Sequence, residues 1–334
     1  MFEKTIGIDL GTANVIVSVR GKGVVANEPS VVAVSSDNKI IAVGKEAKMM
    51  LGKSPDDITV FRPLRSGVIA DYRITLAMLK YFIRKAMGLF WISRPDVMIS
   101  IPVGATSTER KAVIDAGIEA GAKRVFLIKE PLAAAIGAGL PVGEPTGSMV
   151  VNIGGGTSEI ATISLGGILA ATSLRVAGDS FDESIMQYIK KTHNIAIGEV
   201  TAEKIKINIG SATEVPDEDQ LVMTVKGRDL ITGLPKSVDI KTNDVSRCLK
   251  SNLEEIVSAI RQVLEKTPPE VSSDIIDNGI YLTGGSGQIR NLDNFISERI
   301  NVPVFVAKDA QFCVAKGTTI ALESLEYYKR GITS

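Results

Sequence analysis

The sequence contains very little histidine and cysteine. Its single histidine, His193, excludes a metal site made of several histidines. It could also serve in no more than one catalytic triad. Its two cysteines, Cys248 and Cys313, lie far apart and form no CxxC pair, so neither a disulfide framework nor a structural zinc site has support. This cysteine usage fits a reducing cytoplasm.

The chain also lacks net charge and long apolar runs. Its 38 basic residues balance 38 acidic residues, so no overall field draws it to nucleic acid. Uninterrupted apolar runs such as 302–307 are far shorter than the roughly 20 residues that span a bilayer. The residues before the first apolar segment leave no room for a signal peptide. We therefore expect a cytoplasmic protein that binds no nucleic acid and is not integral to a membrane.

Glycine-rich turns are the most informative feature that is present. Three segments, at 5–12, 149–157 and 279–286, consist of a β-branched strand that enters a glycine-rich turn. The first two segments continue into second strands at 15–19 and 159–164. Two such hairpins in one chain predict a duplicated fold unit whose halves face each other.

Helices and strands alternate between and after these hairpins. Apolar residues at helical spacing between Ile74 and Ile83 predict a helix, and short strands follow at 97–101 and 125–128. A polar, weakly patterned stretch at 211–242 is expected to form a small inserted subdomain. The alternation predicts an α/β protein. Further elements are expected at 131 onward (helix), 181–192 (helix), 201–209 (helix), 243–264 (helix), 279–283 (strand), 291–300 (helix) and 302–306 (strand).

Four motifs resemble a known family. They are GIDLGTAN at 7–14, NEPS at 27–30, GVIADY at 67–72 and EKTPPE at 265–270. In this order they resemble the MreB family of bacterial actin homologues, within the superfamily of actin, sugar kinases and heat-shock chaperone ATPases. The resemblance implies an actin-like ATPase fold, with two duplicated α/β domains around a nucleotide cleft, each carrying a small inserted subdomain.

The same resemblance implies subdomain boundaries. Subdomain IA is expected at 1–32, 66–145 and 315–334, IB at 33–65, IIA at 146–181 and 246–314, and IIB at 182–245.

The two glycine turns are candidate phosphate-binding elements. Backbone N–H groups on a tight turn after a strand can hold the phosphate oxygens of ATP. Asp9, just before the first turn, can order the water shell of a phosphate-bound Mg²⁺. One turn alone is equally explained by an ordinary hairpin, but the second matching turn favours phosphate binding. The candidate residues are Gly11, Thr12, Ala13 and Asn14 in the first turn and Gly154, Gly155 and Gly156 in the second.

The resemblance implies contacts to the rest of the nucleotide. Gly178 is expected beside the ribose, and Glu203 with Lys206 at the ribose and adenine edge. Without the resemblance, Glu203 and Lys206 would be interpreted as an exposed ion pair on one helix face. Gly284 and Gly285 are expected to let the adenine ring lie on the backbone.

Hydrolysis depends on three further residues. Glu130 resembles the residue that orients the attacking water, with Thr157 close by. Asn152 departs from the family pattern, which usually has Asp at this position. An amide can form hydrogen bonds but cannot accept the proton of the attacking water. We therefore expect retained ATP binding and a weakened, slow ATPase, unless Glu130 and Thr157 suffice.

The apolar segment at 89–92 is unusual for a loop, because connecting segments normally carry polar residues. It contains Leu89, Phe90, Trp91 and Ile92, so it either folds into the core or meets an apolar surface outside. MreB-type proteins carry a hydrophobic membrane loop at this location. The resemblance therefore implies contact with the inner leaflet of the cytoplasmic membrane.

These observations predict a filament-forming cytoskeletal protein that binds ATP, associates with itself and with the membrane, and helps to determine cell shape. Membrane proteins of cell-shape control or wall synthesis are possible further partners. Two alternatives share the fold: a chaperone-like ATPase and a small-molecule kinase. The first would be expected to carry a further substrate domain, and the second usually has larger insertions and a substrate base in the cleft.

Overall fold

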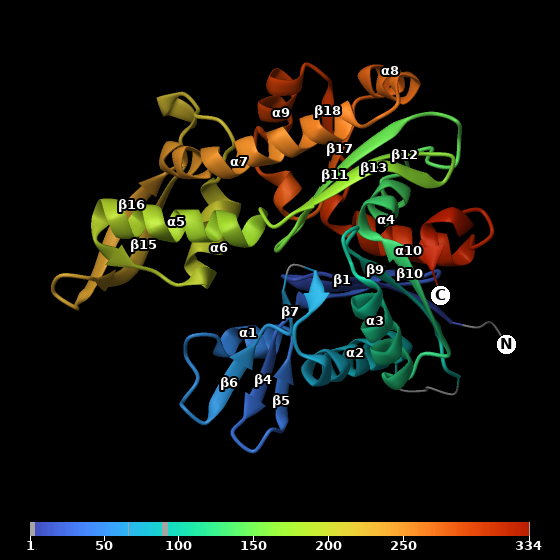
Figure 1. The fold of residues 1–334 in the computed structure, drawn as a ribbon. Helices are drawn as coiled ribbons and strands as arrows, with labels where there is room; N and C mark the ends of the chain where they lie inside the picture. Colours follow the sequence, from blue (N-terminus) through green and yellow to red (C-terminus); the bar gives the residue numbers. More distant parts are fainter. Residues whose placement is uncertain (1–3, 66, 89–92, 334) are drawn as a thin grey trace.

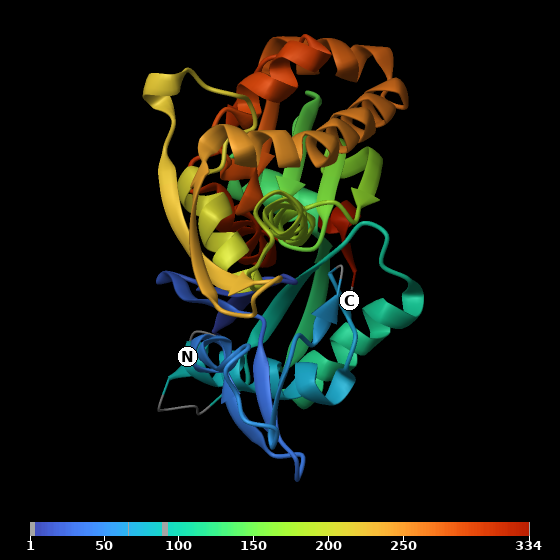
Figure 2. The ribbon, with the colours of Figure 1, turned by 90° about the vertical axis from the view of Figure 1, so that its left-hand side faces the viewer.

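The computed structural model describes residues 4–65, 67–88 and 93–333 (Figure 1). Two large sheets form the cores of the two halves, and a small sheet extends from each half on the same side of the molecule (Figures 1 and 2). Among the described residues, no helix is long and apolar enough to cross a bilayer.

The first half is built on a six-stranded mixed sheet. Its strands are β1 (Thr5–Leu10), β2 (Asn14–Val19), β3 (Gly23–Pro29), β9 (Asp96–Ile101), β10 (Arg124–Lys129) and β19 (Ile332–Thr333). They lie in the order β19-β10-β9-β1-β2-β3, with β1 antiparallel to β2 and parallel to β9. Every residue of β9 is buried, as expected of a strand covered on both faces.

The second half repeats this plan. Its sheet contains β11 (Ser148–Ile153), β12 (Ser158–Ser164), β13 (Gly167–Leu174), β17 (Ile280–Thr283) and β18 (Val304–Val306). The order is β13-β12-β11-β17-β18, with β11 antiparallel to β12 and parallel to β17. An antiparallel three-stranded run followed by a parallel neighbour thus occurs twice, which confirms the predicted duplication.

Two helices join the halves. Helices α4 (Glu130–Gly137) and α10 (Cys313–Glu323) share one apolar cluster with residues of both large sheets, including Met98 and Val150. Their backbones approach closely: a Cβ atom at Gly137 would lie 1.8 Å from the Cys313 carbonyl oxygen. Only glycine permits this packing, which fixes the middle layer of the molecule.

The outer layers consist of longer helices. Helices α2 (Tyr72–Met87) and α3 (Ser107–Glu119) cover the outer face of the first sheet. Helix α2 begins after Asp71, whose carboxylate accepts the Ile74 N–H at 2.9 Å. The second sheet is covered by α5 (Gly178–His193), α7 (Thr242–Glu265), α8 (Pro269–Asn278) and α9 (Leu292–Ile300).

Each half also carries a small three-stranded sheet with one short helix. The first consists of β4 (Val32–Ser35), β5 (Ile40–Val43) and β6 (Ile58–Phe61), with α1 (Lys45–Met50). The second consists of β14 (Ile195–Ala196), β15 (Val222–Asp229) and β16 (Pro235–Lys241), with α6 (Glu199–Ile209). A short ribbon of β7 (Leu64–Arg65) and β8 (Val68–Ile69) follows the first, and 3₁₀ turns lie at 217–219, 286–288, 310–312 and 329–331.

Candidate nucleotide site

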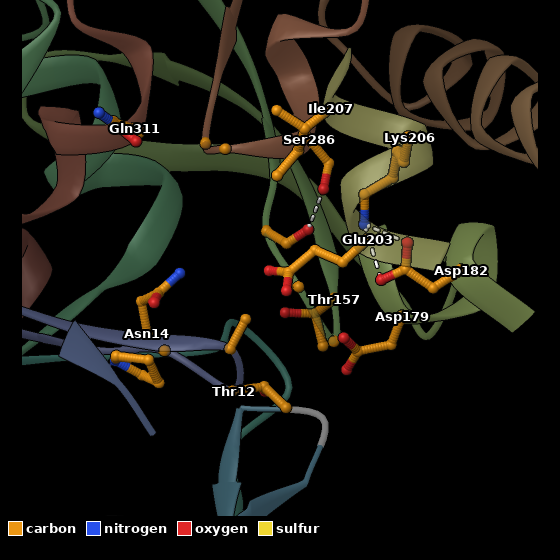
Figure 3. A pocket seen from close by; sticks show the side chains of 18 of the residues that line it. Thr12, Asn14, Thr157, Asp179, Asp182, Glu203, Lys206, Ile207, Ser286 and Gln311 are labelled. Atoms are coloured by element: carbon orange, nitrogen blue, oxygen red, sulfur yellow. Dashed lines mark hydrogen bonds and ion pairs between the residues drawn. The ribbon is translucent and has the colours of Figure 1, made fainter. Parts of the chain in front are cut away.

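A cavity of about 770 Å³ lies between the two halves (Figure 3). Gly178 lies next to it, since a Cβ atom there would be 3.2 Å from both the Gly154 oxygen and the Lys206 nitrogen. The cavity brings together these residues expected from the sequence: Asp9, Gly11, Thr12, Ala13, Asn14, Glu130, Asn152, Gly154, Gly155, Gly156, Thr157, Glu203, Lys206, Gly284 and Gly285.

The first glycine turn connects β1 to β2. The Ser30 hydroxyl donates to the Gly11 carbonyl, and the Ser30 N–H donates to the Ala13 carbonyl at 2.9 Å. The Gly67 N–H donates to the Thr12 hydroxyl oxygen at 2.8 Å. These bonds hold the turn through its carbonyl and hydroxyl oxygens, so they do not consume its N–H groups.

The second turn connects β11 to β12 and is anchored to the start of α5. The Gly155 carbonyl accepts the Asp179 N–H at 2.8 Å, and the Gly154 carbonyl accepts the Ser286 hydroxyl at 2.8 Å (Figure 3). The two turns touch: a Cβ atom at Gly155 would lie 2.4 Å from the Ala13 Cβ. Glycine therefore lets the phosphate turns of the two halves meet.

Three acidic side chains gather beside these turns. The Asp9 carboxylate accepts a hydrogen bond from the Ser100 hydroxyl at 3.1 Å. Burial raises the Asp9 pKa to about 7, although the hydrogen bond from Ser100 acts to lower it. Glu130 is buried at the start of α4. Burial, then the charge of Glu159, then that of Asp9, raise the Glu130 pKa well above its usual value. A positive charge nearby would lower the cost of ionising these carboxylates.

Glu159 is a site residue that the sequence analysis missed. It is fully buried on β12, and burial raises its pKa, while hydrogen bonds from the Ser173 hydroxyl and the Val103 N–H oppose this rise. Its sequence signal is an acidic residue in a strand that is otherwise made of small and apolar residues. A buried acid in such a strand needs polar partners, which a single sequence does not identify.

Asn152 is buried directly opposite Glu159 in the β11–β12 pair. Its side-chain oxygen accepts the Thr283 hydroxyl at 3.1 Å. Residues directly opposite each other in an antiparallel pair point to the same face. The amide therefore lies at the acidic group, at the position where the family resemblance predicts a carboxylate.

Glu203 and Lys206 line the cavity but bind different partners. The Lys206 ammonium lies 2.8 Å from the Gly178 carbonyl and 2.9 Å from the Asp182 carboxylate (Figure 3). Burial raises the Asp182 pKa to about 6, although the Lys206 charge acts in the opposite direction. Glu203 pairs with Lys48 of the opposite small subdomain at 2.5 Å. The interpretation of Glu203 and Lys206 as an ion pair with each other, which the helix spacing alone suggested, is therefore wrong.

Leu89, Phe90, Trp91 and Ile92 lie outside the described residues, so their expected membrane contact stays a prediction. The helix that precedes them, α2, is tied to the first sheet near its end. There, the Lys85 ammonium bonds to the buried carboxylate of Glu28.

No group of three or more His, Cys, Asp or Glu side chains is arranged to hold a metal ion directly in the part of the chain that the structure describes. The water-mediated role predicted for Asp9 needs only one carboxylate near a phosphate-bound ion. Asp9 lines the cavity next to the first glycine turn, which fits that role.

Comparison with known proteins identifies the family. The model of the MreB/Mbl protein family matches residues 3–330. The cell shape-determining protein Mbl of Bacillus cereus is 47% identical, over 98% of both chains. The structure of MreB 5 of Spiroplasma citri bound to AMPPNP has a TM-score of 0.92 and 38% identity, over 98% of both chains. The MamK double helical filament has a TM-score of 0.80 at 20% identity, over 96% of this chain and 98% of that one, and supports the fold. These matches confirm the predicted actin-like fold, and this chain belongs to the MreB/Mbl family of actin-like cytoskeletal proteins.

Proposed function

We propose that this chain binds ATP with Mg²⁺ between its halves and assembles into filaments that help to determine cell shape. The observation that carries this proposal is the meeting of two glycine turns, one from each half, in one cavity. Such turns present N–H groups to one phosphate chain from both sides. The bound AMPPNP in the related MreB 5 structure supports the same ligand class.

Each part of the cavity has a proposed role. The glycine turns hold the β- and γ-phosphates, and Asp9 holds Mg²⁺ through water. Gly178, Glu203 and Lys206 bind the ribose and the adenine edge, while Gly284 and Gly285 support the adenine ring. Bound Mg²⁺ supplies positive charge that stabilises the phosphates and the nearby carboxylates.

Hydrolysis would be slow in this site. A water oxygen attacks the γ-phosphorus, the bond to the bridging oxygen breaks, ADP leaves, and a proton of the water must be accepted. Glu130 is the proposed acceptor, with Thr157 positioning the water. Asn152 supplies a hydrogen-bonding group without negative charge, so the site would have less electrostatic stabilisation than a site with Asp at this position.

Nucleotide binding is tested most directly at the contact between the turns. Gly155→Ala places a methyl group where the Ala13 side chain lies, so the turns must separate. We expect ATP affinity to fall by roughly tenfold or more, equivalent to about 1.4 kcal/mol. Titration with a fluorescent ATP analogue measures this. Gly198→Ala is the matched control, because a Cβ atom there meets open space. Equal affinities for the two variants would contradict the proposed phosphate site.

Membrane association is the second part of the proposal. Four large apolar side chains in the loop 89–92 would contribute several kcal/mol on insertion, at ~25 cal/mol per Å². The inner leaflet of the cytoplasmic membrane is the proposed surface, and membrane proteins of cell-shape control or wall synthesis are the proposed partners there.

Replacing Leu89, Phe90 and Trp91 together by Ser should abolish co-sedimentation with liposomes and leave the melting temperature nearly unchanged. Leu165→Ser is the matched control, because it removes an exposed leucine from a turn elsewhere. A large fall in melting temperature in the loop variant would show that these side chains belong to the core, against the membrane proposal.

A further inference from the structure

Two ion pairs join the small subdomains of the two halves. The Lys48 ammonium on α1 lies 2.5 Å from the Glu203 carboxylate on α6. The Arg62 guanidinium, directly after β6, lies 2.8 Å from the Glu199 carboxylate at the start of α6. Both cations come from the first half, and both acids come from the second, one helical turn apart on one face of α6. We call these two pairs the latch.

The latch forms part of the wall of the nucleotide cavity, since all its residues line that cavity. Arg62 and Glu199 also line a second cavity of about 580 Å³, which reaches Thr12 and Gly156 of the two glycine turns. The two cavities therefore adjoin each other at the Arg62–Glu199 pair, close to the proposed phosphate positions. A nucleotide bound between the halves would be enclosed in part by the latch.

The helices that carry the latch are each fixed to their own half. On α6, Lys206 bonds to the Gly178 carbonyl and the Asp182 carboxylate, both of which belong to α5. At the start of α1, the Lys45 N–H donates to the buried carboxylate of Glu28 on β3 at 3.3 Å. Because each helix is held by its own half, the small subdomains can move apart only when the latch breaks.

The strength of the latch suits a closure that opens repeatedly. All its side chains are partly exposed to solvent. An ion pair of this kind typically shifts an equilibrium by up to about fivefold, and dissolved salt weakens it. Two such pairs acting together would favour the closed arrangement by roughly tenfold, which is enough to slow exchange without preventing it.

We propose that the latch is a gate of the nucleotide cavity: Lys48 and Arg62 hold the halves closed, and their ion pairs must break before nucleotide enters or leaves. This inference rests on the proposed binding of ATP in this cavity, and it adds a control of the exchange rate. Each pair joins two protein groups and includes no nucleotide atom. Loosening the latch should therefore speed binding and release alike and leave the affinity nearly unchanged.

The combined variant Lys48→Ala, Arg62→Ala tests the gate. Stopped-flow measurements with a fluorescent ATP analogue give its association and dissociation rates. We expect both rates to rise by roughly tenfold, with their ratio nearly unchanged. Lys53→Ala and Lys204→Ala are the matched controls, because they remove exposed lysines of the same two subdomains that line neither cavity. Both controls should exchange nucleotide like the parent protein.

A charge swap separates the ion pair from general packing. Arg62→Glu alone and Glu199→Arg alone each place like charges opposite each other, so each should speed exchange. The variant with both substitutions restores an ion pair of reversed polarity, and its rates should return toward those of the parent. Added salt should speed exchange in the parent more than in the combined latch variant. A purely structural role of Arg62 would not be rescued by the swap.

The opening itself is measurable without nucleotide. Spin labels at Asp56→Cys and Lys226→Cys, two exposed positions on the two small subdomains, report the distance between them. Cys248→Ser removes the more accessible natural thiol, and Cys313 is buried. We expect the distance distribution to become broader and longer in the combined latch variant.

Three results decide the matter. An unchanged distance distribution in the combined latch variant would overturn the inference, whatever the nucleotide does. Faster release with unchanged association would also overturn it, because that result indicates a lost nucleotide contact rather than a gate. A broader distribution in a protein that binds no ATP would support the latch between the subdomains and contradict the proposed function instead.

Discussion

With Mg·ATP, the protein should sediment as filaments of one actin-like subunit repeat, and without nucleotide most of it should stay in the supernatant. The cavity is lined by both halves, so a bound nucleotide ties them together and fixes one angle between them. Only a fixed angle lets the same head-to-tail contact repeat along a filament without closing into a ring. Ultracentrifugation and electron microscopy measure the effect.

The Gly155→Ala variant should assemble only at much higher ATP concentration, because its defect lies in binding nucleotide. Gly198→Ala should assemble like the parent protein. A monomeric parent protein with ATP, with a non-hydrolysable analogue and with lipid would show that the cytoskeletal proposal is wrong for this chain.

The glycine turns were predictable from sequence because their signal is local. A β-branched strand, a turn that contains glycine and a second strand occur within about 15 residues, and this pattern determines both the hairpin and the backbone that its turn presents. The structure places these predicted turns on the same cavity. Most predicted helices also lie within a few residues of their observed bounds, since amphipathic periodicity determines them.

A helix that is covered on several sides and outer elements that are only partly buried were harder to predict. Helix α10 packs between the two sheets and shows small residues such as Gly317 and Thr318 rather than an apolar stripe. The outer strands β3 and β13 and the short helix α8 were also not predicted as elements. Their sequences show weak alternation or mixed polarity because each is only partly buried.

Contacts between distant segments were not predictable from one sequence. The Glu203 partner, Lys48, comes from the opposite small subdomain, and the Val103 N–H reaches Glu159 from the other half. Spacing on one helix favoured a Glu203–Lys206 pair, but the fold supplies closer partners for both. The proposed subdomain boundaries likewise depend on the family resemblance rather than on any local pattern.

Asn152→Asp is expected to have the largest effect on turnover. Asn152 faces Glu159 across the strand pair, and its side-chain oxygen accepts the Thr283 hydroxyl. A carboxylate at this position keeps that acceptor and adds negative charge next to the proposed metal and water. Removing one polar group that stabilises a transition state typically costs roughly 10²- to 10³-fold in rate. Restoring the carboxylate should raise phosphate release by a comparable factor, with little change in ATP affinity.

The added charge also has a cost that distinguishes catalysis from a general change. Without Mg·ATP, the introduced carboxylate would join those of Asp9, Glu130 and Glu159, so the variant should unfold at a lower temperature than the parent at neutral pH. Mg·ATP should remove most of this difference, because the cation stabilises the carboxylates. Asn152→Ala, which adds no charge, should not accelerate phosphate release. If the parent already releases phosphate as fast as Asn152→Asp, then Glu130 and Thr157 suffice, and the amide does not limit hydrolysis.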